Sequence, residues 1–237
     1  MTENQELKLQ LLNKFASSDT PATVDFCREA YKFLTEGEAK PQAPVQQPIT
    51  DTKADGFYLI YENGEVAPYN PIYGDANEFN DSPVKYIGIK WGSRTLKVAL
   101  HDMAGGKDIT LTATEDKTKG YKRYIETRID AVADWNGKDN TEHLKDIGLN
   151  KEIKLADGEY IPALGELYFI YLNRKALNEI LEKVGGEPIA DEWYWTSTET
   201  SATYAWILYL NLGRANSGYG TKAAYAGRVR AVSAFIL

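Results

Sequence analysis

WYWTSTETSATYAWILYLNLGRANSGYGTKAAYAGRVRAVSAFIL, residues 193–237, is the most informative stretch of the chain. Both of its ends have strand patterns, with large aromatic residues at the start and apolar residues at alternate positions near the end: Trp193, Tyr194, Trp195, Val229, Ala231, Phe235 and Leu237. Between residues 200 and 227, tyrosines stand among Ala, Ser, Thr, Gly and Asn, and the only charges are Arg214 and Lys222. Binding loops of antibodies favour such a mixture, since Tyr gives a broad contact area and small polar residues give adaptable hydrogen bonds. The composition predicts an exposed contact surface, whereas a linking loop between the last strands is the plainer alternative.

The same stretch resembles the variable proteins of diversity-generating retroelements, whose C-terminal domain has the C-type lectin-like fold. The resemblance lies in the framework WYWTSTE, the pair Ala205-Trp206, Gly213 and the terminal RVRAVSAF. In that family adenines of a copied template are mutated, so that Asn codons become scattered through a defined set of residues. The resemblance implies a ligand-binding surface at the positions whose residues belong to that set: Tyr204, Ile207, Tyr209, Leu212, Arg214, Ala215, Asn216, Ser217, Gly218, Tyr219, Gly220, Ala223, Ala224, Tyr225, Ala226 and Gly227. Residues outside the set, such as Glu199, Trp206 and Lys222, fall where the framework would lie.

The function implied by this resemblance is non-enzymatic recognition of a macromolecular ligand, a protein or a surface receptor. Phage attachment to a bacterial surface and a cell-associated protein with the same massive sequence variation are the two settings that it suggests. The tyrosines are expected to be anchors and Arg214 a charged contact, because interface energy concentrates in Tyr, Trp and Arg. No cofactor and no metal ion are expected.

Composition restricts the remaining classes of protein. With 237 residues and 43% hydrophobic content, the chain can bury one main core with an appendage. A formal net charge of -7 argues against general nucleic-acid binding, which needs a basic surface. Cys27 is the single cysteine, which excludes an intrachain disulfide and a zinc site of paired thiolates. Arg228 and Arg230 lie in a strand pattern and are expected to form ion pairs within the framework.

The sequence divides into an arm, a linker and a domain. Residues 1–35 predict a small helical arm, which either packs on the domain or drives oligomerisation. Residues 36–55 contain Pro41, Pro44 and Pro48 and predict a semi-extended linker. No signal peptide or membrane-spanning run is visible, so we expect cytoplasmic synthesis without membrane insertion, followed by association with a virion or export by another route.

From residue 56 to residue 237 the pattern predicts an α+β domain of short antiparallel strands, two main helices and long loops. Alternating strands are expected around residues 57–61, 84–89 and 96–100, with a hairpin turn at Asn63-Gly64. Helices are expected over residues 115–129 and 140–147, and again after Pro162 in two pieces that end at Gly185-Gly186.

Two alternative functions remain open. An enzyme or catalytic accessory would use His101 beside Asp102 at a strand end, where a lone histidine is more often structural. A structural virion or envelope component would assemble through residues 1–35. The calcium-dependent sugar site of C-type lectins is not expected, because Glu187-Pro188 is followed by Ile189 and not by Asn. Asp and Asn residues near residues 75–81 lack the spacing of a calcium-binding loop.

Overall fold

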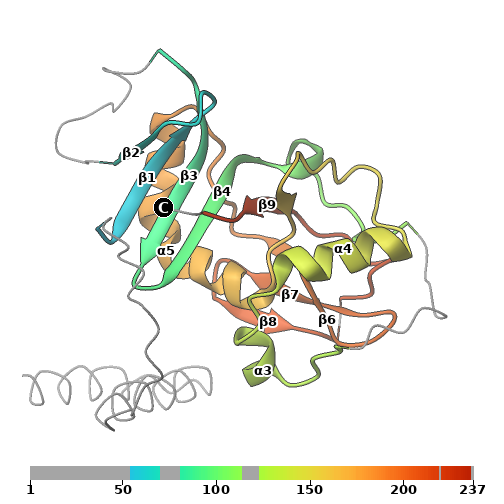
Figure 1. The fold of residues 1–237 in the computed structure, drawn as a ribbon. Coiled ribbons are helices and arrows are strands. Elements are labelled where there is room, and N and C mark those ends of the chain that lie inside the picture. Colours follow the sequence, from blue (N-terminus) through green and yellow to red (C-terminus); the bar gives the residue numbers. More distant parts are fainter. Residues whose placement is uncertain (1–53, 70–80, 114–122, 219, 236–237) are drawn as a thin grey trace, which may run out of the picture. The chain divides into compact units, whose positions relative to one another are not determined.

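The computed structural model describes residues 54–69, 81–113, 123–218 and 220–235 (Figure 1). The chain divides into two units between Asp51 and Thr52, and all described residues belong to the second unit. The predicted helical arm, residues 1–35, lies outside the described residues, and so does the predicted linker except for Ala54 and Asp55.

The described residues form an α+β domain with two antiparallel sheets. The first sheet has six strands in the order β2-β1-β3-β4-β9-β5, and the second has three in the order β6-β7-β8. The α+β class predicted from the sequence is confirmed. The elements are β1 (Gly56–Tyr61), β2 (Val66–Pro68), β3 (Val84–Trp91), β4 (Arg94–Asp102), the 3-10 helix η2 (Met103–Gly106), α3 (Arg128–Val132), α4 (Gly137–Ile147), β5 (Glu159–Tyr160), α5 (Leu164–Lys183), β6 (Trp193–Glu199), β7 (Ala205–Tyr209), β8 (Arg214–Asn216) and β9 (Arg230–Ser233).

The first sheet grows from two hairpins, as the alternating sequence predicts. The β1–β2 turn contains Gly64 with a φ of 88°, a conformation that glycine adopts without strain, and its N–H donates to the Tyr61 carbonyl at 3.0 Å. Across the sheet Leu59 of β1 pairs with Ile87 of β3, which pairs with Val98 of β4. All three side chains are fully buried, so the period-two pattern marks the inner face correctly.

Helix α5 packs its buried face against strands of both sheets. Leu167, Ile170 and Leu177 of α5 share one core with Leu59 of β1 and Leu208 of β7. The sequence predicted two helical pieces here, which is wrong, because α5 is one helix of 20 residues. No Gly or Pro interrupts it between residues 166 and 183, and its exposed middle contains residues that are compatible with a helix.

The helix predicted over residues 115–129 is mostly absent from its described part. Residues 114–122 lie outside the described residues, residues 123–127 are not helical, and α3 begins at Arg128. Thr127 is the N-cap of α3, and its hydroxyl accepts a hydrogen bond from the Asp130 N–H at 3.2 Å. An N-cap residue has extended backbone angles, so the helix begins after it. Among the described helices, none is both long and apolar enough to cross a membrane.

Candidate recognition surface

Strand β7 lies between two parts of the core and gives the C-terminal segment a fixed base. Trp206 and Leu208 contribute to the core beneath α5. Ala205 and Ile207, which alternate with them, contribute to a second core that contains the fully buried Trp195. Because both faces of β7 are covered, a recognition surface has to come from the strand ends and from the loops that follow.

A buried ion pair holds the loop between β8 and β9. The ammonium of Lys222 donates to the carboxylate of Glu199 at the end of β6, and both side chains are almost completely buried. Burial raises the pKa of Glu199, and the adjacent ammonium of Lys222 partly offsets this rise. The Lys222 N–H donates to the Thr203 carbonyl at 2.9 Å, while its own carbonyl accepts from Leu111 and Thr112 at 2.8 and 3.0 Å. The loop is therefore attached at its middle by backbone as well as side-chain bonds.

A second buried ion pair joins β9 to β4 and β6. Arg230 Nε donates to Asp102 Oδ1 at 2.5 Å, and the hydroxyl of Tyr194 donates to Asp102 Oδ2 at 2.7 Å. Arg228 Nη1 lies 3.4 Å from the same Oδ2. Burial and the neighbouring carboxylate raise the pKa of Tyr194, so its hydroxyl remains protonated as a donor. The predicted framework ion pairs of Arg228 and Arg230 are confirmed.

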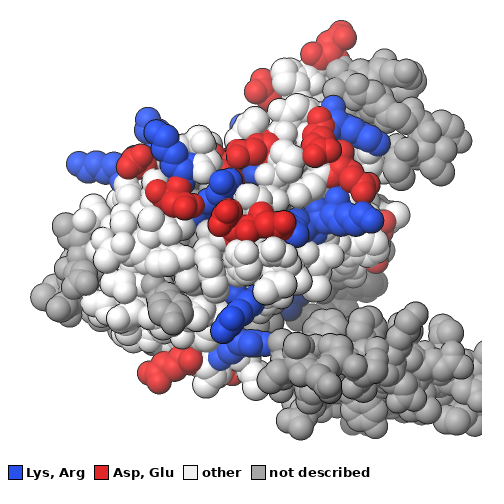
Figure 2. Space-filling model, turned by 180° about the vertical axis from the view of Figure 1, so that it is seen from behind, with Lys and Arg blue, Asp and Glu red and all other residues white. Residues whose placement is uncertain are grey.

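Most described members of the predicted surface reach solvent. Leu212 is 67% exposed and Tyr204 is 36% exposed. Seen from behind, charged side chains gather mainly over the upper part of the described surface (Figure 2). The partly or fully exposed members of the predicted surface are Tyr204, Tyr209, Leu212, Arg214, Ala215, Asn216, Ser217, Gly218, Ala223, Ala224, Tyr225 and Ala226.

Two partly exposed tyrosines are fixed by aromatic packing. Tyr209 stacks on Trp193 across the β6–β7 pair, with ring centroids 5.1 Å apart and an interplanar angle of 29°. Tyr225 meets the buried ring of Trp195 edge-on at 5.6 Å. Each ring is held on one side by the framework, so these tyrosines have the rigidity expected of contact anchors.

Three predicted surface positions are wrong. Ile207 is fully buried in the second core, because β7 is covered on both faces. Gly220 and Gly227 are buried where the loop backbone passes close to the framework, and a Cβ at Gly220 would lie 2.1 Å from the carbonyl oxygen of Ala205. These two glycines fix the course of the loop. Tyr219, another predicted surface residue, lies outside the described residues.

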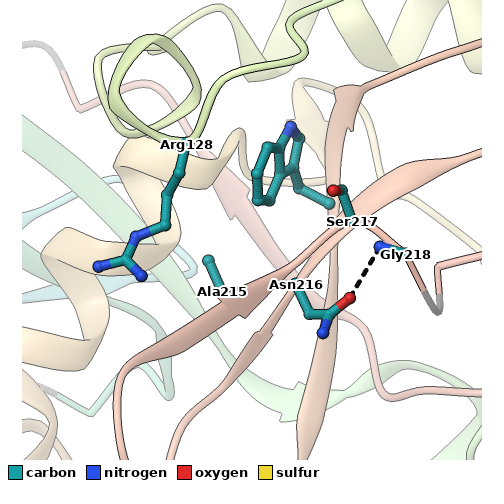
Figure 3. A pocket seen from close by; sticks show the side chains of 6 residues that line it. Arg128, Ala215, Asn216, Ser217 and Gly218 are labelled. Carbon is teal, nitrogen blue, oxygen red and sulfur yellow. Dashed lines mark hydrogen bonds between the residues drawn. The ribbon is translucent and has the colours of Figure 1, made fainter. Parts of the chain in front are cut away.

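An open groove of about 590 Å³ adjoins the loop after β8. Arg128 of α3 stands on one side, and Asn216, Ser217 and Gly218 lie on the other (Figure 3). Asn216 Oδ1 accepts a hydrogen bond from the Gly218 N–H at 2.7 Å, which shapes this wall. Ala215 and Trp206 complete the lining.

Sequence reasoning missed Arg128 as a neighbour of this surface and placed Trp206 only in the framework. Their proximity depends on Ile125, whose N–H donates to the Glu199 carbonyl and whose carbonyl accepts from Trp206 Nε1, each at 2.8 Å. These bonds bring the chain before α3 against β6 and β7. Neither the spacing of the sequence nor its hydrophobic pattern indicates such a contact between segments so far apart.

The geometry at His101 differs from that of the catalytic pair proposed as an alternative function. His101 is exposed, whereas Asp102 is buried and its carboxylate is bonded to Arg230, Tyr194 and Arg228. These three partners contact both carboxylate oxygens, and none of the partners described for Asp102 is His101. Within the described ranges, no group of three or more His, Cys, Asp or Glu side chains is placed to hold a metal ion.

Comparison with known proteins gives distant similarities. No protein-family model matches the chain. Lysophospholipase 1 from two strains of Aspergillus fumigatus is 26% identical over 122 residues, which cover 50% of this chain but 19% of the fungal protein. The chain thus spans about a fifth of the length of these curated relatives. A fimbrial protein from Bacteroides ovatus has 17% sequence identity and a TM-score of 0.48, and the match covers 77% of this chain and 49% of that one.

Proposed function

We propose that this protein is a ligand-binding protein of the diversity-generating retroelement type, which displays a diversified surface on a C-type lectin-like scaffold. Its ligand is a macromolecule, a protein or a surface receptor. By resemblance, the setting is phage attachment to a bacterial surface or a cell-associated protein of the same diversified kind. The domain acts by binding and not by catalysis.

The observation that carries this proposal is the difference in burial between two sets of residues within residues 200–227. The charged and bulky residues that the resemblance assigns to the framework, such as Trp206 and Lys222, are buried and bonded. Small and phenolic residues that flank them in the sequence, such as Tyr204 and Ala224, are exposed. Substitution of an exposed side chain leaves buried contacts intact, so the surface can vary while the fold remains.

The exposed side chains have the chemistry of a protein-binding surface. Tyr209 and Tyr225 are rigid aromatic contacts, and Arg214 supplies a charge at the exposed start of β8. Ala, Ser and Gly between them leave room for the side chains of a partner. Truncation of such Tyr or Arg anchors typically weakens binding by about 2 kcal/mol or more.

A library experiment tests the proposal. Tyr204, Tyr209, Arg214, Asn216 and Ala224 are randomised in the full chain, displayed on yeast, sorted for resistance to protease, and then selected against streptavidin and serum albumin. We expect most variants to stay folded and specific binders to appear for each probe. If randomisation abolishes protease resistance, the exposed residues are part of the folding core and the proposal is wrong.

The matched control library randomises exposed positions on α4: Lys138, Asp139, Glu142, Lys145 and Asp146. These variants are expected to fold equally well and to give few binders. An equal yield of binders from both libraries would show that the C-terminal surface has no special capacity for recognition. A further check lies in the flanking DNA, where we expect a near-copy of the last coding segment, different at adenines and beside a reverse transcriptase gene.

A further inference from the structure

The groove beside residues 215–218 combines one fixed wall with one wall from the proposed diversified surface. Arg128 belongs to α3, outside the C-terminal segment, and Trp206 is a buried framework residue, whereas Asn216, Ser217 and Gly218 lie in the loop that follows β8. We propose that this groove binds a carboxylate-bearing side chain, Asp or Glu, of a protein partner. This inference rests on the proposed function and names the chemistry that one part of the surface recognises.

The positive charge that lines the groove differs from the buried positive charges of β9 and of the loop before it. Lys222 and Arg230 each face a buried carboxylate. Arg128 forms no ion pair with any residue in the described part of the chain, and the groove lining contains no carboxylate. A guanidinium that lines a groove and has no counter-ion among the described residues is suited to a carboxylate, which it can bind with two parallel hydrogen bonds.

The size and openness of the groove fit a side chain presented by a larger molecule. Its volume of about 590 Å³ lies within the range of small-ligand sites. It is open to solvent along the surface, so a bound group can remain attached to an extended partner. The Ser217 hydroxyl and the polar wall around Asn216 offer neutral hydrogen-bonding groups opposite Arg128 (Figure 3).

Exposed apolar side chains in the segments that contain the lining residues favour a peptide over an acidic glycan. Ile129, which follows Arg128, is 60% exposed, and Leu212 in the turn between β7 and β8 is 67% exposed. The hydroxyl of Tyr168 of α5 donates to the carbonyl of Gly213, the residue after Leu212, at 2.7 Å. Burial raises the pKa of Tyr168, and the positive charge of Arg128 partly offsets the rise, as expected for neighbouring groups. An acidic residue flanked by apolar residues would match this arrangement.

Arg128 and residues 215–218 would then contribute differently to ligand binding. Arg128 lies outside residues 193–237, so the acidic anchor would be common to ligands of differently diversified copies. Residues 215–218 line the same groove and would select among the residues that flank the anchor. A salt-sensitive contact with Arg128 is expected, because the side chain is only partly buried.

The test uses the full chain and a phage-displayed library of random peptides as the probe. We expect enrichment of peptides with an Asp or Glu beside apolar residues. For these peptides Arg128→Gln should weaken binding at least about tenfold, and Arg128→Lys should retain part of it, since a charge-assisted bidentate pair is stronger than a neutral contact. Arg123→Gln is the matched control, because Arg123 is exposed in the same segment but does not line the groove. Circular dichroism should show the same melting for all variants.

Each outcome has a distinct meaning. If enriched peptides lose binding with Tyr204→Ala and Tyr209→Ala but not with Arg128→Gln, the groove inference is overturned while the proposed function stands. Enrichment of peptides without acidic residues, or no enrichment at all, also overturns it. Arg128-dependent binding of polysialic acid without binding of acidic peptides would assign the groove to a glycan and refute the peptide assignment. If no substitution at the C-terminal surface weakened the binding of the enriched peptides, the proposed function itself would be contradicted.

Discussion

Replacement of Lys222 by Met should destabilise the domain far more than the same replacement at an exposed lysine. In the ion pair with Glu199 the two side chains are 3% and 0% exposed. Met keeps the apolar stem and removes the ammonium, so the main effect is a buried carboxylate that has lost its ammonium partner. Loss of one partner of a buried pair typically lowers the free energy of unfolding by about 3–5 kcal/mol.

Lys145→Met is the internal control for this prediction. Lys145 pairs with Glu142 at 2.7 Å, but the two side chains are 42% and 62% exposed. Exposed pairs contribute about 0.2–1 kcal/mol, so the control should remain close to the wild type. Urea unfolding followed by tryptophan fluorescence measures both changes in the same chain. Similar small losses for the two variants would refute the conclusion that Lys222 holds the loop.

The Lys222→Met defect should depend on pH. Burial already raises the pKa of Glu199, and loss of the Lys222 ammonium should raise this pKa further. A carboxyl group whose pKa is raised in the folded state stabilises the fold at low pH, where the group is protonated. This stabilisation is lost as pH rises through the folded-state pKa. His143 Nε2 lies 3.3 Å from Glu199 Oε2. The defect should therefore be largest near pH 8 and smaller at pH 5, and Glu199→Gln in the same chain should relieve part of it.

Three further predictions follow from buried contacts. Gly220→Ala should strongly lower the melting temperature, because its Cβ would lie 2.1 Å from the Ala205 carbonyl oxygen, while Gly218→Ala, with its nearest contact at 3.6 Å, should change it little. Burial raises the pKa of Glu166 to about 7 from 4.5, so stability should fall by roughly 3 kcal/mol from pH 4 to pH 8, and Glu166→Gln should remove most of this slope in urea unfolding. Asp102→Asn, which removes the charge facing a buried guanidinium, should lower the free energy of unfolding by about 3–5 kcal/mol in the same assay.

The sequence predicts the first sheet well because its signals are local. Alternation in β1, β3 and β4 and the Asn63-Gly64 turn depend on residues close together in the chain, and each of these elements is found. The same local rules fail at α3, where Thr127 caps a helix that a broad propensity window places earlier. They also fail at Ile207, since a one-strand pattern does not reveal that both faces of β7 are covered.

The candidate surface could be predicted only in part, for a related reason. Composition identifies residues suited to contact, but exposure depends on long-range bonds such as those of Lys222 with Glu199 and of Trp206 with Ile125. The groove needs Arg128, and no local pattern connects it with residues 215–218. Contacts between residues that are far apart in the sequence can be identified only from the folded structure.

The position of the buried bonds is compatible with the proposal that one segment combines a stable fold with a variable surface. Strand β7 is covered on both faces, so alternation along a strand does not provide the exposed positions. They lie instead at the end of β7, in β8 and in the following loop, whose backbone is attached at Lys222, Gly220 and Gly227 by hydrogen bonds to the framework. Backbone bonds do not depend on the identity of neighbouring side chains. The proposed variation between the attachment points would therefore change the chemistry of the surface while the course of the loop is preserved.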